Sequence, residues 1–232
     1  MPYRDSSGDT PPAAQRADGD TVVHLLRHGK VQNPEGILYG TLPGYRLARS
    51  GEAMARGVAE HLRGSDIRYL AASSLERAQQ TIAPIADQAN VPVITDDRLI
   101  EAGNSFAGTR FTPTSLLRPV TWSRMIHPTR PSWGEPYLDI ARRMLAAVTA
   151  AETAARGHVA VLVSHQLPIW TVRRFLSGQR LWHNPAVREC ALASLTSLYF
   201  SSGVLVRIGY TEPVAHIAAV DDPVTPGPGR TT

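Results

Sequence analysis

The chain has 232 residues, of which 43% are hydrophobic, enough for one sizeable α/β core with room for an inserted lid. Its net charge of +4 comes from 24 basic and 20 acidic residues without long runs of one sign, so we expect no nucleic-acid partner. No stretch approaches the ~18 apolar residues needed to span a bilayer, which predicts no membrane contact. The single cysteine, Cys190, excludes an intrachain disulfide and predicts a cytoplasmic location.

Strands and helices are predicted to alternate along most of the chain. In order, we expect a strand at 21–27, helix 51–63, strand 67–73, helix 75–89, strand 91–95, helix 137–156, strand 158–163, helix 167–177 and strands 193–200 and 204–210. This alternation favours an α/β fold, a three-layer α/β/α sandwich with a mainly parallel sheet. The last two strands are expected to form a hairpin that adds an antiparallel edge.

Three segments are expected to lie outside this regular pattern. Residues 1–20 are rich in Asp, Ser, Pro and Gly, and residues 223–232 are rich in Pro and Gly, so we predict a disordered N-terminal tail at 1–20 and a flexible C-terminal tail at 213–232 around a domain at 21–212. Residues 100–135 show no periodicity yet are long for a connection, and we predict an inserted lid over the site. The alternative is a partly helical excursion that packs its aromatic residues on the domain.

The first strand ends in an unusual group of residues. The apolar run 21–26 is followed directly by Arg27, His28 and Gly29. Ligands bind at the carboxyl ends of strands in open α/β sheets, and glycine lets the backbone approach a ligand closely. A guanidinium beside an imidazole indicates a phosphate site, with the arginine holding the anion and the histidine available for covalent or acid–base chemistry. The alternative is an ordinary strand end whose charges face water.

Two further strands end in residues of the same kind. Arg77 lies one turn inside the helix that follows the second strand, close to an N-terminus that favours anions. Ser164 and His165 end the apolar strand 158–163. Because the carboxyl ends of parallel strands emerge at one edge of a sheet, two arginines and two histidines are predicted to converge on one pocket.

In this order, the motifs resemble those of the histidine phosphatase superfamily, which includes the cofactor-dependent phosphoglycerate mutases. The resemblance covers about Val22 to Phe200 and rests on Leu26-Arg27-His28-Gly29, Asn33, the segment 73–81 (SSLERAQQT), Glu101 and Ser164-His165. Two features depart from the family pattern. Gln166 replaces the more common glycine after the second histidine, and the residues that follow Glu101 differ from the usual sequence.

The resemblance implies a catalytic set of His28, Glu101, Arg27, Arg77 and His165. A neutral His28 is expected to attack phosphorus through one ring nitrogen while the other donates to a backbone carbonyl. Glu101 is the expected general acid, with a pKa raised by burial. The predicted substrate-binding residues are Arg27, Gly29, Asn33, Arg77, His165 and Gln166.

We expect neither a metal nor another cofactor. The cationic side chains can take the place of a metal in neutralising a phosphate. His24 and His28 have a spacing that suits a metal on a helix, but the apolar context predicts a strand, in which His24 is a core histidine.

The leading hypothesis is therefore a metal-independent phosphomonoesterase that hydrolyses a small phosphorylated metabolite through a phosphohistidine. The alternative is a cofactor-dependent phosphoglycerate mutase, which returns the phosphoryl group to a second hydroxyl. Phosphatase is favoured because the chain is short and lacks the Glu-Arg-His-Tyr-Gly-type segment typical of mutases. A non-catalytic phospho-ligand-binding module is disfavoured because every expected catalytic residue is present. The only other partner we predict is a second copy, in a possible homodimer.

Overall fold

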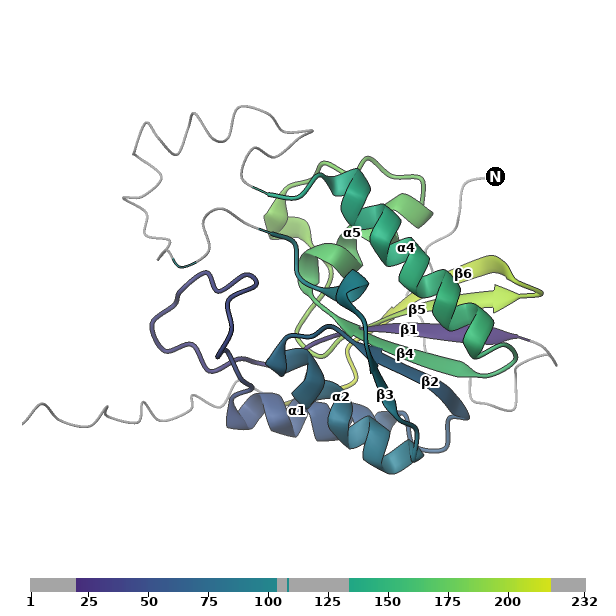
Figure 1. The fold of residues 1–232 in the computed structure, drawn as a ribbon, viewed down its shortest axis with the longest axis horizontal. Coiled ribbons are helices and arrows are strands. Elements are labelled where there is room, and N and C mark those ends of the chain that lie inside the picture. Colours follow the sequence, from purple (N-terminus) through teal and green to yellow (C-terminus); the bar gives the residue numbers. More distant parts are fainter. Residues whose placement is uncertain (1–19, 104–107, 109–133, 218–232) are drawn as a thin grey trace, which may run out of the picture.

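A six-stranded sheet in the order β3-β2-β4-β1-β5-β6 runs through the centre of the protein (Figure 1). The computed structural model describes residues 20–103, 108 and 134–217. The strands are β1 (Thr21–Arg27), β2 (Ile67–Ala72), β3 (Val93–Thr95), β4 (Val159–Ser164), β5 (Leu195–Ser201) and β6 (Val204–Thr211). The first four strands are parallel, whereas β5 pairs antiparallel with both β1 and β6.

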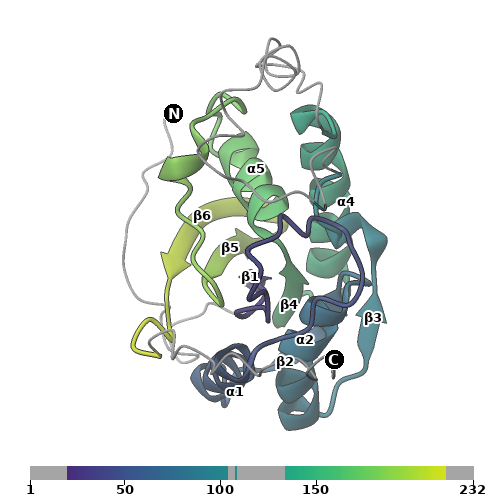
Figure 2. The ribbon, with the colours of Figure 1, turned by 90° about the vertical axis from the view of Figure 1, so that its left-hand side faces the viewer.

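Helices cover both faces of this sheet (Figure 2). Helices α1 (Arg49–His61) and α2 (Glu76–Ala89) lie on one face, and α4 (Tyr137–Ala154) and α5 (Gln166–Leu176) lie on the other. Two short 3-10 helices, η2 (Asp97–Leu99) and η4 (Pro185–Val187), lie in connections. The predicted three-layer α/β/α sandwich is confirmed, and so is the antiparallel hairpin at one edge.

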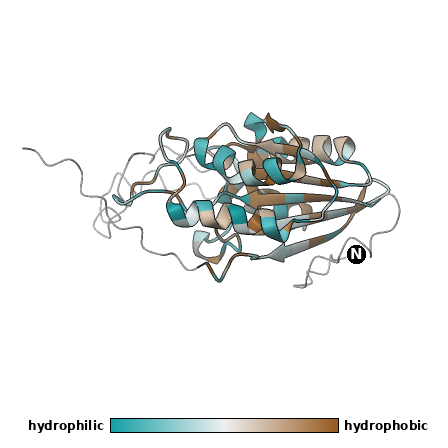
Figure 3. Cartoon of the chain, turned by 90° about the horizontal axis from the view of Figure 1, so that it is seen from below, coloured by the Kyte–Doolittle hydropathy of each residue, from teal (hydrophilic) through white to brown (hydrophobic). Residues whose placement is uncertain are grey.

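The two helical layers bury separate apolar cores against the sheet, and Figure 3 shows the hydrophobic strands enclosed between amphipathic helices. Side chains alternate along β1, so that Val23 and Leu25 belong to the core under α4 and α5, and Val22 and Leu26 to the core under α1 and α2. Complete burial of each such side chain contributes roughly 1.5–3 kcal/mol. His24 is buried in this strand and its Nδ1 lies 2.8 Å from Ser197 Oγ, so it is a core histidine, as expected.

The register of the parallel strands fixes which residues meet at their carboxyl ends. Arg27 lies opposite Ser164 in the pairing of β1 with β4, and Ala72 lies opposite Val163 in the pairing of β2 with β4. The segments that follow β1, β2 and β4 therefore leave the sheet at the same edge. The predicted convergence of these three strand ends is confirmed.

One predicted boundary is wrong. Residues 213–217, which we assigned to the flexible tail, form a turn against α1, and Val214 is buried. The physical reason is a short apolar pair, Val214 and Ile217, that packs on the core between α1 and the sheet. The rest of both predicted tails lies outside the described residues. In the described part of the chain, no helix is long and apolar enough to cross a membrane.

Two glycines bring the segment after β1 into backbone contact with α1. A Cβ on Gly29 would lie 2.7 Å from the carbonyl oxygen of Gly51, and a Cβ on Gly51 would lie 2.0 Å from that of Lys30. Both oxygens belong to the main chain, so neither can move away by a side-chain rotation. The absence of a side chain at both positions is therefore a condition for this packing.

We predict that Gly51→Ala destabilises the protein even though alanine is the better helix former by about 1 kcal/mol. The overlap with a main-chain oxygen costs more than this gain, for a net loss of roughly 1–3 kcal/mol in the free energy of unfolding. Urea denaturation at neutral pH measures the loss. Gly103→Ala is the control, because no heavy atom lies within 4 Å of the place that its Cβ would take. Equal stability of both variants would contradict the prediction.

Candidate active site

His28 follows β1 directly and is almost completely buried. Its Nδ1 lies 2.8 Å from the carbonyl oxygen of Gly29, and because a carbonyl can only accept, Nδ1 carries the proton. Burial lowers the pKa of His28 to about 3, and the charges of Arg27 and Arg77 act in the same direction. The imidazole is therefore neutral at physiological pH, and Nε2 presents a lone pair.

His165 lies beside His28 at the end of the adjacent strand. The two ring centroids are 5.1 Å apart, and His165 Nε2 lies 2.7 Å from the hydroxyl of Ser73, which follows β2. Burial is the main reason that the pKa of His165 lies well below its usual value. His165 is thus neutral at physiological pH, so it offers a hydrogen bond rather than a positive charge.

Two arginines lie around this histidine pair, and each is anchored by a main-chain oxygen. Arg27 Nη1 donates to the Cys190 carbonyl at 2.6 Å, and Arg77 Nη2 donates to the Gly40 carbonyl at 2.6 Å. The Arg77 guanidinium also stacks on the Tyr39 ring, 4.8 Å from its centroid. Within the described part of the chain, neither arginine forms an ion pair with a carboxylate, so both charges remain available to an anion.

Three buried nitrogens of this group have no hydrogen-bond partner among the described residues. They are Arg27 Nε, Arg77 Nε and His165 Nδ1. Buried polar groups are normally paired, and an unpaired donor costs about 1–3 kcal/mol. An anion that reached the two arginine nitrogens would supply the acceptors that they lack, and His165 Nδ1 is a third donor in the tautomer whose Nε2 accepts from Ser73. The predicted phosphate site therefore has the donors and the charge that it needs.

Glu101 follows the short helix η2 and lines a cavity of about 340 Å³. Its Oε1 accepts a hydrogen bond from the Ala102 N–H at 2.9 Å. Burial nonetheless raises the pKa of Glu101, outweighing this hydrogen bond and the nearby arginine charges. The charges of Arg27 and Arg77 act on both Glu101 and His28, and a carboxyl with a raised pKa in one site with a histidine of lowered pKa is the arrangement expected of a general acid and a nucleophile.

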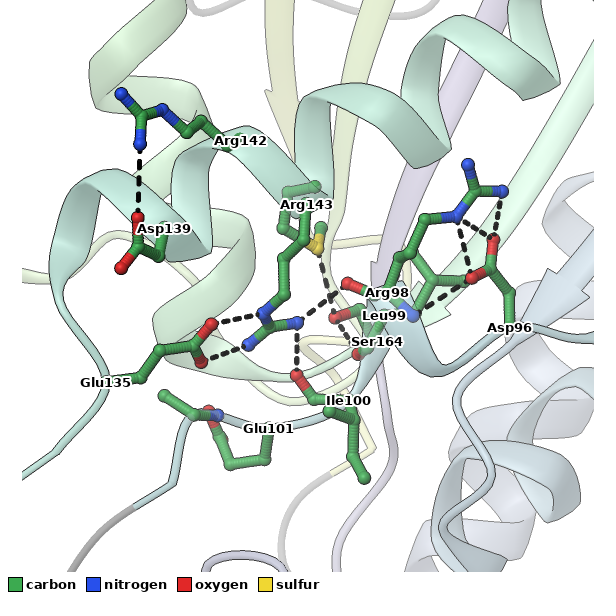
Figure 4. Close-up of polar contacts among 12 residues, drawn as sticks. Asp96, Arg98, Leu99, Ile100, Glu101, Glu135, Asp139, Arg142, Arg143 and Ser164 are labelled. Atoms are coloured by element: carbon green, nitrogen blue, oxygen red, sulfur yellow. Dashed lines mark hydrogen bonds and ion pairs between the residues drawn. The ribbon is translucent and has the colours of Figure 1, made fainter.

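Arg143 of α4 holds the segment that carries Glu101 (Figure 4). Its Nη1 donates to the carbonyls of Arg98 and Ile100, both at 2.7 Å, while Nε and Nη2 form a forked pair with Glu135 at 2.8 and 2.9 Å. From the sheet side, the Ser164 hydroxyl donates to the Leu99 carbonyl at 2.6 Å. The position of Glu101 is thus set by hydrogen bonds from both α4 and β4.

The other predicted substrate-binding residues have partners within the protein. The Asn33 side chain accepts from the Ile37 N–H at 3.0 Å and donates to the Ile37 carbonyl at 2.8 Å. The Gly29 N–H donates to Thr81 Oγ1 at 3.1 Å. Gln166 lines the cavity, and its Nε2 lies 3.4 Å from the Cys190 carbonyl. Their contacts with a substrate stay predictions.

Sequence reasoning missed Tyr39, Arg143 and Arg188. Tyr39 and Arg188 line the cavity, and Glu135 and Arg143 brace the Glu101 segment. The topology of the sheet could have indicated that the loop carrying Arg188 lies near the site. Because β5 runs antiparallel to β1, the loop before β5 returns to the edge at which β1 ends, and the Arg27 N–H donates to the Ser194 carbonyl at 3.1 Å. The sequence pattern predicts the hairpin at an edge but does not say which strand it joins.

The predicted lid falls mostly outside the described residues, since only 100–103, 108 and 134–135 of it are described. Its function therefore stays a prediction. Among the described residues, no three His, Cys, Asp or Glu side chains come together as they would around a metal ion. Cys190 is buried, which raises the pKa of its thiol to about 11 and makes it a poor nucleophile.

Known proteins share both the sequence pattern and the fold around this site. A sequence model of the histidine phosphatase superfamily (branch 1) matches residues 23–209. The uncharacterized protein Rv0525 of Mycobacterium tuberculosis is 50% identical over 198 residues, which cover 84% of this chain and 98% of that protein. A probable phosphoglycerate mutase, GpmB of Yersinia enterocolitica, is 34% identical over 197 residues, covering 80% of this chain and 90% of its own.

A solved structure also resembles this one. Mycobacterial glucosyl-3-phosphoglycerate phosphatase Rv2419c superposes with a TM-score of 0.66, covering 83% of this chain and 96% of its own. The sequence identity of this pair is 24%, so the likeness shows a shared fold and not a shared substrate.

The lowered pKa of His28 predicts that the protein loses stability in mild acid. With a pKa of 6.5 when unfolded and about 3 when folded, the unfolded chain binds the extra proton between these values, so stability falls as pH falls through this window. Between pH 6.5 and pH 5, the protonation of this histidine in the unfolded chain lowers the free energy of unfolding by about 2 kcal/mol. The free energy of unfolding, measured by urea denaturation at several pH values, should therefore fall less steeply for His28→Asn. His61→Asn, an exposed substitution, should keep the wild-type slope. A wild-type slope in His28→Asn would contradict the assignment.

Proposed function

This chain belongs to the histidine phosphatase superfamily, and we propose from that premise that it is a phosphomonoesterase that acts on a small phosphorylated metabolite through a phosphohistidine at His28. One observation carries the proposal. Nδ1 of His28 is held protonated by the Gly29 carbonyl, so Nε2 presents a lone pair, and the buried Nε groups of Arg27 and Arg77 and Nδ1 of the neighbouring His165 lack partners among the described residues. A nucleophile next to an anion-binding group is what phosphoryl transfer requires.

In the first step, the lone pair of His28 Nε2 attacks phosphorus in line with the ester oxygen. The N–P bond forms as the P–O bond to the leaving group breaks, and Glu101 gives its proton to the departing alkoxide. Arg27, Arg77 and His165 donate hydrogen bonds to the phosphoryl oxygens, whose charge would otherwise repel the nucleophile. The Nδ1 proton stays on its hydrogen bond to the Gly29 carbonyl throughout.

In the second step, water replaces the leaving group. Glu101, now a carboxylate, removes a proton from water as its oxygen attacks phosphorus, and the N–P bond breaks to return the electron pair to His28. Inorganic phosphate leaves, and Glu101 is protonated again. The raised pKa of Glu101 and the low pKa of His28 support these roles, because burial favours the protonated form of the acid and the neutral form of the nucleophile.

A phosphoglycerate mutase is the second candidate, and the similarity to a probable phosphoglycerate mutase at 34% identity favours keeping it. A mutase would use the same phosphohistidine but would transfer the phosphoryl group to a second hydroxyl. The two functions differ in the lifetime of the intermediate. A phosphatase loses it to water within a turnover, whereas a mutase protects it and requires a bisphosphoglycerate to maintain it. Phosphohistidine decay, followed with and without added bisphosphoglycerate, distinguishes them.

We predict that the wild type releases phosphate from p-nitrophenyl phosphate or from a member of a small phosphometabolite panel in excess EDTA, because arginines rather than a metal neutralise the phosphate. His28→Asn should lower the rate by roughly 10³-fold or more, since it removes the atom that forms the intermediate. Circular dichroism confirms that the variant is folded. EDTA-sensitive activity, or activity near wild type in His28→Asn, would contradict the mechanism.

We predict that Glu101→Gln slows esters with poor leaving groups far more than activated ones. The value of kcat/KM reports the steps up to departure of the leaving group, which is where Glu101 donates its proton. For glycerol 3-phosphate, kcat/KM should fall by about 10²-fold or more, and for p-nitrophenyl phosphate by less than about 10-fold. Equal losses for the two esters would show that another group supplies the proton.

A further inference from the structure

Arg188 lines the cavity that Glu101 lines, and the chemistry described above leaves this arginine unused. It lies just after η4, in the loop between α5 and β5, and lines the same cavity of about 340 Å³ as Glu101, Tyr39 and Gln166. Its Nε donates to His183 Nε2 at 2.9 Å, which anchors the inner end of the guanidinium. As far as the structure describes the chain, both Nη groups remain for another partner.

No carboxylate neutralises Arg188 within the described part of the chain. Its sequence neighbour Glu189 pairs with Arg173 at 2.7 Å, and Glu135, on the cavity wall, pairs with Arg143 at 2.8 Å. The remaining acid on the wall is Glu101, whose pKa is raised by burial. A half-buried guanidinium without a counter-ion is costly to keep, and burial indeed lowers the pKa of Arg188.

On the proposed mechanism Arg188 faces the leaving group, because it lines the same cavity as Glu101, the expected general acid. The charges that lower the pKa of His28 are those of Arg27 and Arg77, which surround the expected phosphate position. The charge of Arg188 is not among the causes of that shift, but together with the larger effects of Arg77 and Arg27 it lowers the pKa of Glu101, the residue that would protonate the departing oxygen. Arg188 shares the cavity wall with Glu101, so the part of a substrate beyond the ester oxygen would meet it.

We propose that Arg188 forms a second anion subsite, which selects phosphomonoesters whose leaving group carries its own anionic group, a carboxylate or a second phosphate. As a substrate preference, this inference rests on the proposed phosphatase function. Two free Nη groups can bind either anion in a forked arrangement. The size of the cavity limits the leaving group to a small metabolite, with its anionic group a few atoms from the ester oxygen. Burial raises the pKa of Glu101 on the same wall, which favours the form of this carboxyl that does not repel an anion.

Binding of compounds that cannot turn over tests the subsite by itself. Propylphosphonate has one anionic group, whereas 3-phosphonopropionate adds a carboxylate and propane-1,3-bisphosphonate adds a second phosphonate. By isothermal titration calorimetry, the wild type should bind at least one of the latter two about 10-fold or more tightly than propylphosphonate. In Arg188→Gln, this preference should fall by about 10- to 100-fold, the range of a hydrogen-bonded ion pair. The compound that shows the larger fall identifies the anion as a carboxylate or a phosphate.

Two further variants separate a subsite from general electrostatics and from misfolding. Arg63→Gln removes the same charge from an exposed side chain at the end of α1 and should leave the preference as in the wild type. Arg188→Lys keeps the charge but loses the forked geometry, so its preference should lie between wild type and Arg188→Gln. The proposed subsite is wrong if the wild type does not prefer the compounds with a second anionic group. It is also wrong if the wild type and the three variants show the same preference.

Turnover distinguishes failure of the subsite from failure of the proposed function. The measure is the ratio of kcat/KM for 3-phosphoglycerate to that for glycerol 3-phosphate, and Arg188→Gln should lower it by about 10-fold or more. If hydrolysis depends on His28 but the ratio is the same in the wild type and in Arg188→Gln, the subsite is wrong and the phosphatase function stands. An Arg188-dependent binding preference without any hydrolysis leaves the subsite in place and overturns the phosphatase.

Discussion

The parallel pairing of β1 with β4 is the constraint on which the rest of the site depends. Its register sets Arg27 opposite Ser164, so the next residue of each strand is a histidine, and the His28 N–H donates to the Ser164 carbonyl at 3.2 Å. Neighbouring strands lie about 4.8 Å apart, close to the 5.1 Å between the two imidazole rings. The sheet itself therefore sets the spacing of the histidines, and the loops only have to bring the arginines and Glu101 to this edge.

Burial at this edge accounts for the electrostatic character of the site. Both histidines are neutral because taking them out of water disfavours their charged forms, and the same effect favours the protonated form of Glu101. The arginines cannot respond in this way and stay charged without carboxylate partners among the described residues. Each buried unpaired ion costs roughly several kcal/mol, and the two apolar cores on either side of the sheet offset this cost. The fold thus maintains an unfavourable charge distribution that a bound anion relieves.

The parts of this site that could be predicted from sequence depend on short-range patterns. The apolar run that ends at Arg27 predicts both the strand and the edge at which His28 lies, and the same holds for His165. The roles of Arg143 and Arg188 could not be found in this way, because Arg143 holds the carbonyls of Arg98 and Ile100 and Arg188 shares a cavity wall with Glu101, and these segments lie far apart in the chain. The predicted start of the C-terminal tail was wrong for a related reason. Val214 packs on α1, which lies far earlier in the chain, and only the folded structure brings the two together.

The hydrogen bond that fixes the tautomer of His28 has an evolutionary consequence. Its acceptor is the main-chain carbonyl of Gly29, whereas in many enzymes a carboxylate side chain orients the histidine. Every amino acid has a main-chain carbonyl, so no single codon change can delete this acceptor. The tautomer of the nucleophile therefore depends on the path of the backbone at Gly29 and not on a second side chain, so substitutions on the cavity wall can change the substrate without removing this acceptor.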